Sequence, residues 1–228
     1  REQAELEELA GFLKDENEAR LRIVIGDGTL LDVTRGLLHG FCQRYPQVQL
    51  DLDFENLSGP RERLLDGEAD LIVHHDDPSD PRFECQKIAE VKILPVVAPG
   101  FLGFEPDADT RYAELRPYTQ CIIRDTARHI EKEKHFILDE AHCITVGDQH
   151  TKKSIIVQGM AWGHMPDFMI SKELEEGTLV SIEGPWIKGF VVDIVVARVA
   201  GSRRGKMAQK LWDSFLAIPD VMEEAETD

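Results

Sequence analysis

Polar turns that follow apolar runs carry the side chains of this chain that could bind a small ligand. The first turn, Gly26-Asp27-Gly28-Thr29, follows the apolar run Leu21–Ile25 and precedes apolar residues at helical spacing: Leu30, Val33, Leu37, Leu38 and Phe41. This pattern predicts a buried strand, a turn and a helix. In a parallel α/β sheet such a turn lies at the carboxyl end of a strand, where ligands bind. The alternative is an ordinary connection in which Asp27 and Thr29 only cap the helix.

Histidines follow two further apolar runs and could act as acids, bases or metal ligands. His74-His75 comes after Asp70–Val73, and His150 comes shortly after Cys143–Val146. Neighbouring residues of a strand point to opposite faces, so at most one of His74 and His75 is expected to line a site. No metal-ligand spacing recurs, and no nucleophile elbow, phosphate loop or HExxH motif is present. We therefore predict no catalytic residue, no metal and no cofactor, and expect a protein that is not an enzyme.

The four cysteines are Cys42, Cys85, Cys121 and Cys143, and none forms a CxxC motif. Cys42 is expected on the apolar side of a helix, and Cys121 and Cys143 begin apolar runs. Free buried cysteines behave as small hydrophobic residues, which favours a reducing compartment. A redox pair of Cys121 and Cys143 is the alternative.

The elements that must position these turns form two α/β units. In the first half, strands are predicted at 21–25, 48–54 and 70–73, with a helix after each of the first two strands. This βαβαβ order is the signature of an open parallel sheet. The extended stretch 85–97 has no helix before it and could cross into another lobe.

The second half repeats the α/β pattern. Strands are predicted at 121–123, 143–146 and 162–165, and a helix carries Ile155, Ile156 and Met160. The apolar stretch 189–197 is a candidate for the return crossing, and a closing helix covers 207–216. We therefore predict two lobes joined by two crossing strands, with a ligand between the lobes.

Charge and the chain ends restrict the partners. The chain has 228 residues and a formal net charge of -17, so it would repel a phosphate backbone. Residues 1–20 are predicted to form an acidic helix with a narrow stripe of Leu6, Leu9 and Leu13, suited to a coiled coil or a partner helix, or else a frayed leader. The tail from Asp220 is expected to be disordered. No apolar run approaches the roughly 20 residues of a membrane helix.

Four stretches resemble the effector-binding domain of LysR-type transcriptional regulators. Leu21–Gly26 resembles the opening strand of that family. Phe41–Leu50 is similar to its F-x-x-R-Y-P-x-V-x-L segment, Gly67–Val73 to G-E-L-D-L-A-I, and Gly159–Pro166 to the later G-L-G-I-A-L-L-P. The four stretches occur in the family's order and extend over nearly all of residues 21–216.

The resemblance implies an α/β fold of two Rossmann-like lobes joined by two crossover strands, the type 2 periplasmic-binding-protein fold. Residues 1–20 would be the end of a linker helix, 21–93 plus 195–228 lobe I, and 94–194 lobe II. Full-length members are cytoplasmic, form dimers or tetramers, and bind DNA through a winged helix-turn-helix, which is missing here. The resemblance thus implies a small-molecule effector, a homodimer or homotetramer, DNA contact through the absent domain only, and no membrane. The alternative is an extracytoplasmic solute-binding protein of an uptake system.

The resemblance also places the effector contacts on the polar turns and strand ends of both lobes. The residues at matching positions are Asp27, Gly28, Thr29, Asn56, Leu57, Ser58, His74, His75, Asp125, Thr126, Asp148, Gln149, His150 and Pro166. Hydroxyls and N–H groups at helix starts suit an oxyanion. The acids Asp27 and Asp148 would instead favour a cationic or polyhydroxylated effector, or an aromatic one that donates hydroxyl hydrogen bonds. For Thr29, Ser58 and Asp148, simple helix capping is the alternative.

Overall fold

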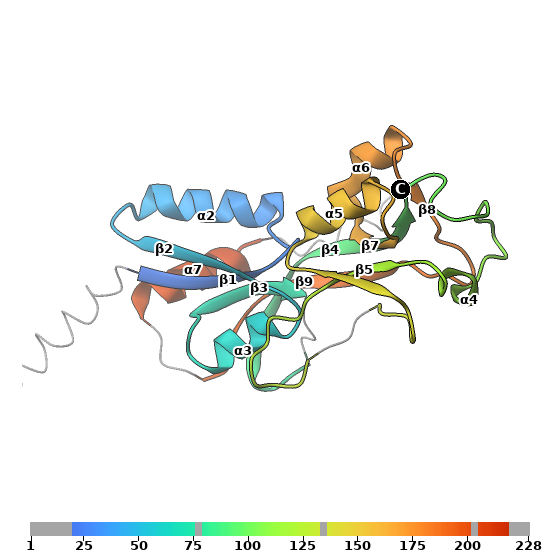
Figure 1. Ribbon diagram of the computed structural model, residues 1–228. Helices are drawn as coiled ribbons and strands as arrows, with labels where there is room; N and C mark the ends of the chain where they lie inside the picture. The colour runs from blue at the N-terminus through green and yellow to red at the C-terminus, as the bar shows by residue number, and fades with distance from the viewer. Residues whose placement is uncertain (1–19, 76–78, 133–135, 202–204, 219–228) are drawn as a thin grey trace, which may run out of the picture. The chain divides into compact units, whose positions relative to one another are not determined.

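A computed structural model of the chain describes residues 20–75, 79–132, 136–201 and 205–218 (Figure 1). The predicted acidic helix, apart from Arg20, and the predicted disordered tail lie outside these residues. The chain divides into two compact units. Unit 1 holds the residues up to Glu55, Pro60–Ala89 and the residues from Ile194 on, and unit 2 holds Asn56–Gly59 and Glu90–Asp193. Each unit is described by itself, and the lobe boundaries stay a prediction.

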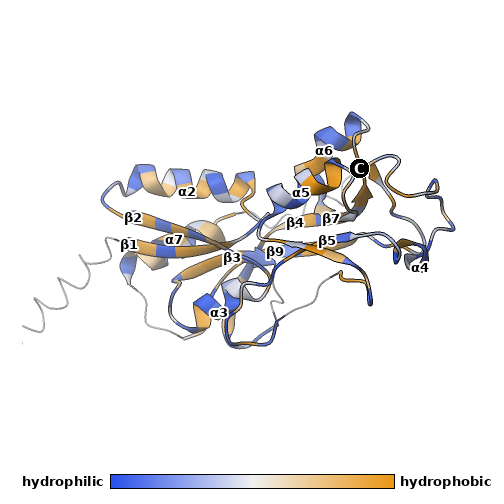
Figure 2. Ribbon diagram, in the orientation of Figure 1, coloured by the Kyte–Doolittle hydropathy of each residue, from blue (hydrophilic) through white to orange (hydrophobic). Residues whose placement is uncertain are grey.

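The sheet of unit 1 contains the predicted parallel strands. These are β1 (Arg20–Gly26), β2 (Gln49–Glu55) and β3 (Leu71–His75), and β9 (Phe190–Val199) runs antiparallel to β3. The order is β2-β1-β3-β9, so β2 lies at an edge. Apolar residues fill the central strands, as Figure 2 shows. β1 and β3 are therefore buried on both faces, as expected of parallel strands under helices.

Among the described residues, unit 1 has the helices α2 (Asp32–Arg44), α3 (Gly59–Leu65, with its first residue in unit 2) and α7 (Lys206–Leu216). α2 packs beside α7 and lies along β1 and β2 (Figure 1). The residue before α2 is Leu31, which makes no side-chain cap. The helix thus begins later than the first turn, and the expectation that Asp27 or Thr29 caps it is wrong.

The cysteines differ from the expectation of buried thiols. Cys121 is buried and Cys85 half-buried, but Cys42 and Cys143 are exposed. Cys42 follows the buried Phe41 on α2. Because successive residues of a helix are about 100° apart around its axis, Cys42 turns away from the buried stripe.

The strands of unit 2 form two groups. β4 (Phe83–Val97), which enters this unit at Glu90, pairs antiparallel with β7 (Gly163–Pro166) and β8 (Val180–Ser181). β5 (Gln120–Ile123) and β6 (Cys143–Val146) form a parallel pair. An isolated bridge from Gln120 to Trp162 joins β5 to the start of β7.

Three helices belong to unit 2: α4 (Tyr112–Leu115), α5 (Gln149–Val157) and α6 (Asp167–Glu175). α5 covers a core that includes Cys121, Ile156 and Met165. The predicted helix after the 143–146 strand is confirmed, but it ends before Met160, which is 51% exposed. The short helices α4 and α6 and the strand β8 were not predicted.

Candidate functional site

The first predicted turn is closed by its own threonine. Gly28 lies at a φ of 78°, a left-handed backbone that glycine adopts without strain. The Thr29 hydroxyl is buried and lies 2.6 Å from the Gly26 carbonyl oxygen and 3.0 Å from that of Val73. A hydroxyl has a single proton to donate, and here two main-chain carbonyls compete for it. Thr29 therefore joins the ends of β1 and β3, and Asp27 donates its N–H to the Glu55 carbonyl oxygen at 3.0 Å.

Both histidines after the third apolar run belong to β3, not to a turn after it. His74 is buried and His75 is half-buried. The His74 ring lies against the backbone of β1, because a Cβ atom placed on Gly26 would come 2.1 Å from His74 Nδ1. Position 26 therefore requires glycine, because any side chain there would displace the His74 ring.

The second predicted turn, Asn56–Ser58, bonds to the loop that follows β5. The Asn56 N–H donates to Thr126 Oγ1 at 2.9 Å, and the Thr126 hydroxyl donates to the Asn56 carbonyl oxygen at 3.1 Å. The Ser58 N–H donates to Asp125 Oδ2 at 3.3 Å. Leu57 has a φ of 53°, the left-handed region that costs a side-chain-bearing residue about 1 kcal/mol. The turn therefore holds a strained backbone that these hydrogen bonds fix.

A third predicted segment begins α5 and also contacts the second turn. The Asn56 amide Nδ2 donates to the Gly147 carbonyl oxygen at 2.7 Å. Asp148 caps α5, because its carboxylate accepts the Thr151 N–H at 2.7 Å and the Thr151 hydroxyl at 2.7 Å. These hydrogen bonds lower the pKa of Asp148, so its carboxylate is ionised at neutral pH.

The structure therefore brings together part of the predicted site within unit 2. Hydrogen bonds join Asn56 to Thr126 and Ser58 to Asp125. Asn56 is also bonded to Gly147, the residue before Asp148. Gln149 and His150 begin α5, and Pro166 is buried at the end of β7. The other predicted contacts belong to unit 1: Asp27, Gly28, Thr29, His74 and His75.

Sequence reasoning missed a buried cation in unit 2. Lys152, in the first turn of α5, is only 6% exposed. Burial lowers the pKa of Lys152 to about 8. Its spacing of four residues from the buried Ile156 is the signal that could have placed it on the inner face of the helix.

A second missed residue of unit 2 is His164 in β7. It is 3% exposed and stacks on Phe136, with ring centroids 4.9 Å apart. Neither ring nitrogen has a hydrogen-bond partner among the residues that the structure describes. Burial, helped by the charge of Lys152, lowers the pKa of His164 to about 3, so the ring is neutral at physiological pH.

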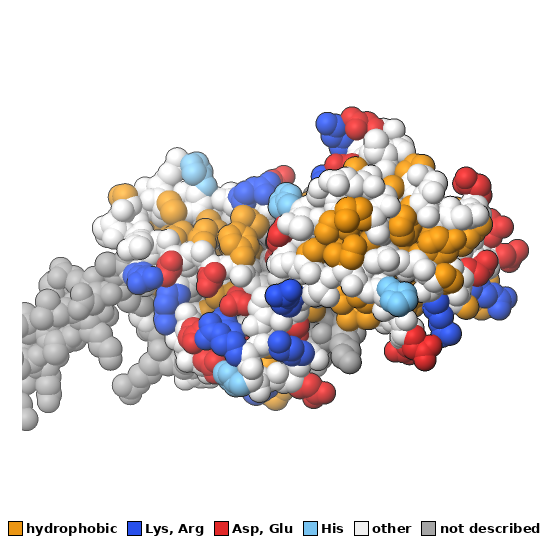
Figure 3. Space-filling view, in the orientation of Figure 1, with side chains coloured by type: hydrophobic (Ala, Val, Ile, Leu, Met, Phe, Trp, Pro, Cys, Tyr) orange, Lys and Arg blue, Asp and Glu red, His pale blue; other side chains and the backbone are white. Residues whose placement is uncertain are grey.

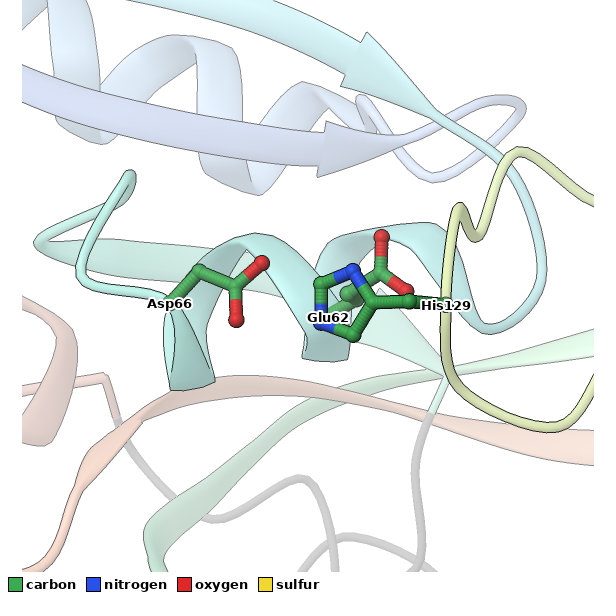
Figure 4. A group of neighbouring side chains, drawn as sticks. All are labelled: Glu62, Asp66 and His129. Atoms are coloured by element: carbon green, nitrogen blue, oxygen red, sulfur yellow. The ribbon is translucent and has the colours of Figure 1, made fainter.

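Charged groups buried in unit 1 are paired. Arg63 on α3 is 2% exposed and forms ion pairs with Glu55, Glu62 and Glu68. Glu62 lies on this helix and is completely buried, and Asp66 follows the end of the helix and is exposed (Figure 4). Because the Glu62 carboxylate is bonded to Arg63, this buried acid is part of the packing of unit 1.

Comparisons with known proteins identify the family of the chain. The family model for the LysR substrate binding domain matches residues 14–218. The transcriptional regulator YeeY of Escherichia coli strain K12 is 28% identical over 179 residues, which cover 77% of this chain and 58% of YeeY. The regulator YfiE of the same strain is 24% identical over 168 residues, 72% of this chain and 57% of YfiE. The chain thus spans less than three-fifths of the length of these relatives, which are named as regulators and not as enzymes.

Solved structures agree on the fold. The regulatory domain of AphB from Vibrio vulnificus has a TM-score of 0.62 and 18% identity, covering 87% of this chain and 98% of that domain. The regulatory domain of CcmR from Synechocystis PCC6803, solved in complex with 2-PG, has a TM-score of 0.66 and 18% identity, covering 89% and 98%. The predicted type 2 periplasmic-binding-protein fold is confirmed.

The chain belongs to the LysR substrate-binding domain family and is a LysR-type regulatory domain. The alternative of an extracytoplasmic solute-binding protein is not favoured by these relatives. Among the described residues, no helix has the length and apolar character needed to cross a bilayer.

Proposed function

We propose that this domain senses a small-molecule effector for a cytoplasmic, DNA-binding transcription regulator. The observation that carries the proposal is the match of the LysR substrate binding domain to residues 14–218. Effector binding would shift the population between two conformations of the regulator and so change its affinity for DNA. The domain would sense its ligand without converting it, in keeping with relatives named as regulators.

The effector would contact the polar turns that the sequence singles out. Support comes from unit 2, where Asn56 connects the loop after β5 to the start of α5. A ligand that contacts one of these segments would affect the others through the hydrogen bonds of Asn56. For the predicted contacts that belong to unit 1, which are Asp27, Gly28, Thr29, His74 and His75, effector contact stays a prediction from the resemblance.

The whole protein would carry a winged helix-turn-helix and a linker helix before residue 20, and would act as a homodimer or homotetramer. Support comes from relatives named as helix-turn-helix regulators, which are considerably longer than this chain. Exposed apolar residues are available for self-association: Leu52 and Phe54 on the edge strand β2 of unit 1, and Phe168 and Trp186 in unit 2. Figure 3 also shows apolar side chains gathered over the surface near α5.

A thermal-shift screen of the purified domain tests effector binding. A ligand that binds only the folded state at 100 times its Kd should stabilise the domain by about 2.7 kcal/mol. The variant Asn56→Ala should weaken that response, whereas Gln158→Ala, at the far end of α5, should not. A footprint of the longer protein on its DNA should then change when the ligand is added. A domain that responds to no compound, in a longer protein that binds no DNA, would contradict the proposal.

A further inference from the structure

Unit 2 contains a nearly buried lysine, Lys152, for which no described residue supplies a counter-ion. Lys152 packs its aliphatic chain against β7, because a Cβ atom placed on Gly163 would lie 3.2 Å from Lys152 Cε. No hydrogen bond or ion pair from its ammonium group reaches any residue of the described part of the chain. A buried ammonium group without a partner is very costly, so proteins rarely keep one unless something neutralises it.

The acids near the start of α5 do not neutralise Lys152. Asp148 lies one turn before it, but its carboxylate accepts the N–H and the hydroxyl of Thr151. Asp125 is 8% exposed and accepts the Ala127 N–H at 2.8 Å. Both carboxylates are therefore held by groups other than Lys152.

The other titratable groups that interact with Lys152 are uncharged. Cys121 on β5 has its pKa raised by burial, so it stays a thiol at neutral pH. His164 on β7 stays a neutral ring. Neither β5 nor β7 therefore supplies a negative charge to the ammonium group.

Lys152 lies in the same first turn of α5 as two of the predicted effector contacts, Gln149 and His150. Its side chain packs toward the strands under α5, where its neighbours are Gly163, Cys121 and His164. The N-terminus of this helix carries a partial positive charge of its own. A buried lysine and a helix N-terminus together form a positive region, which a single negative charge would balance.

We propose that Lys152 forms an ion pair with the carboxylate of the effector, which is a small organic monocarboxylate. This inference rests on the proposed function of the domain. The sequence alone suggests a cationic effector because of Asp27 and Asp148. The structure favours an anionic effector instead, because the Asp148 carboxylate is occupied as the cap of α5. A single ammonium group matches a single carboxylate charge better than a doubly charged phosphate, which commonly recruits arginine or several donors.

The test compares monocarboxylates with their own carboxamides at constant ionic strength and pH 7. Acetate, benzoate and pyruvate, each beside its amide, are titrated into the domain, with the thermal midpoint and calorimetric Kd measured. At least one carboxylate should bind to the unmodified domain more tightly than its amide. Lys152→Met should weaken that carboxylate at least tenfold, and Lys152→Arg, which keeps the charge, should weaken it less.

Lys153→Met is the matched control, because Lys153 is the next residue and is already paired with Glu173 at 2.6 Å. It should bind the carboxylate as the unmodified domain does, and circular dichroism should show that all three variants are folded. A carboxylate that binds Lys152→Met as well as the unmodified domain would overturn the inference. So would a domain that binds none of these carboxylates.

The screen also separates the inference from the function on which it rests. Binding of a cationic or neutral compound that Lys152→Met leaves unchanged would overturn the role of Lys152 and keep effector sensing. A longer protein that ignores every compound and binds no DNA would overturn both.

Discussion

The two units bury charged and polar side chains in opposite ways. In unit 1, Arg63 is 2% exposed and has three carboxylate partners. In unit 2, Lys152 is 6% exposed and His164 is 3% exposed, and no described residue bonds the ammonium group or the ring nitrogens. Burial of a charge is tolerable when partners replace water, and the three carboxylates give the buried Arg63 such partners. In the described part of unit 2, Lys152 has no carboxylate partner, and the proposed ion pair assigns that place to the ligand.

The pKa values express the same contrast. Burial alone would lower the pKa of Arg63, but the hydrogen bond to Glu68 and the charges of Glu55, Glu62 and Glu68 outweigh it and raise the pKa. For Lys152 and His164, burial dominates, and both pKa values fall. The folded state therefore favours the charged form of the cation in unit 1 and disfavours the charged forms of the two bases in unit 2.

Removal of the arginine should break the paired network and give the largest effect. Arg63→Met would leave the buried carboxylate of Glu62 without its cation, and such a loss costs about 4 kcal/mol. The midpoint of urea unfolding measures it. Arg35→Met, at an exposed ion pair on α2, is the control and should change the stability by less than about 0.5 kcal/mol. Equal losses of stability in Arg63→Met and Arg35→Met would mean that burial of the network does not increase its contribution to stability.

Acid should destabilise the protein through His164. Between pH 6.5 and about 3, His164 is protonated in the unfolded chain but stays neutral in the folded protein. The free energy of unfolding therefore falls as the pH drops through this window. From pH 6.5 to pH 4 the loss is about 3 kcal/mol. His164→Phe, which can keep the stack on Phe136, should remove this part of the pH dependence. An unchanged pH profile in His164→Phe, matching that of the exposed His142→Phe control, would contradict the role of burial.

Removal of the buried lysine should stabilise the ligand-free protein. Lys152→Met replaces an unpaired ammonium group by an apolar chain. This change should raise the free energy of unfolding by about 2 kcal/mol at pH 7. Between pH 8 and 10.5 the unfolded chain holds the proton that the folded Lys152 releases, so the stability of the unmodified protein rises with pH there. The advantage of the variant should therefore shrink over this window. Urea unfolding at pH 7 and pH 10 measures both values, and a destabilised Lys152→Met would argue for an unrecognised internal partner.

The smallest effect is expected at the exposed edge of the paired network. Glu68 also bonds Arg63, at 3.0 Å, but its side chain is 45% exposed. Glu68→Gln should cost only about 0.5 kcal/mol, because water and salt weaken an exposed ion pair. The same urea titration used for Arg63→Met would measure it, and a loss as large as that of Arg63→Met would show that the contrast between buried and exposed partners is false.

The sequence predicted the regular elements of both units well where apolar periodicity is strong. β6 has the predicted bounds, and β1, β3 and β5 differ from the predicted strands by one or two residues. α4 and β8 are only four and two residues long, too short for a periodic pattern. In α6 only Ile170 is buried, so the helix shows no stripe that would reveal it.

By itself, the sequence determined the family, the fold class and the turns in which ligand contacts are expected, because these depend on local patterns. Only the tertiary structure showed that Thr29 bonds the Val73 carbonyl, since its partner is 44 residues away. It also decided the state of Lys152. Helical spacing can place this side chain on an inner face, but whether a carboxylate meets it there depends on β5 and β7, which come from distant parts of the chain.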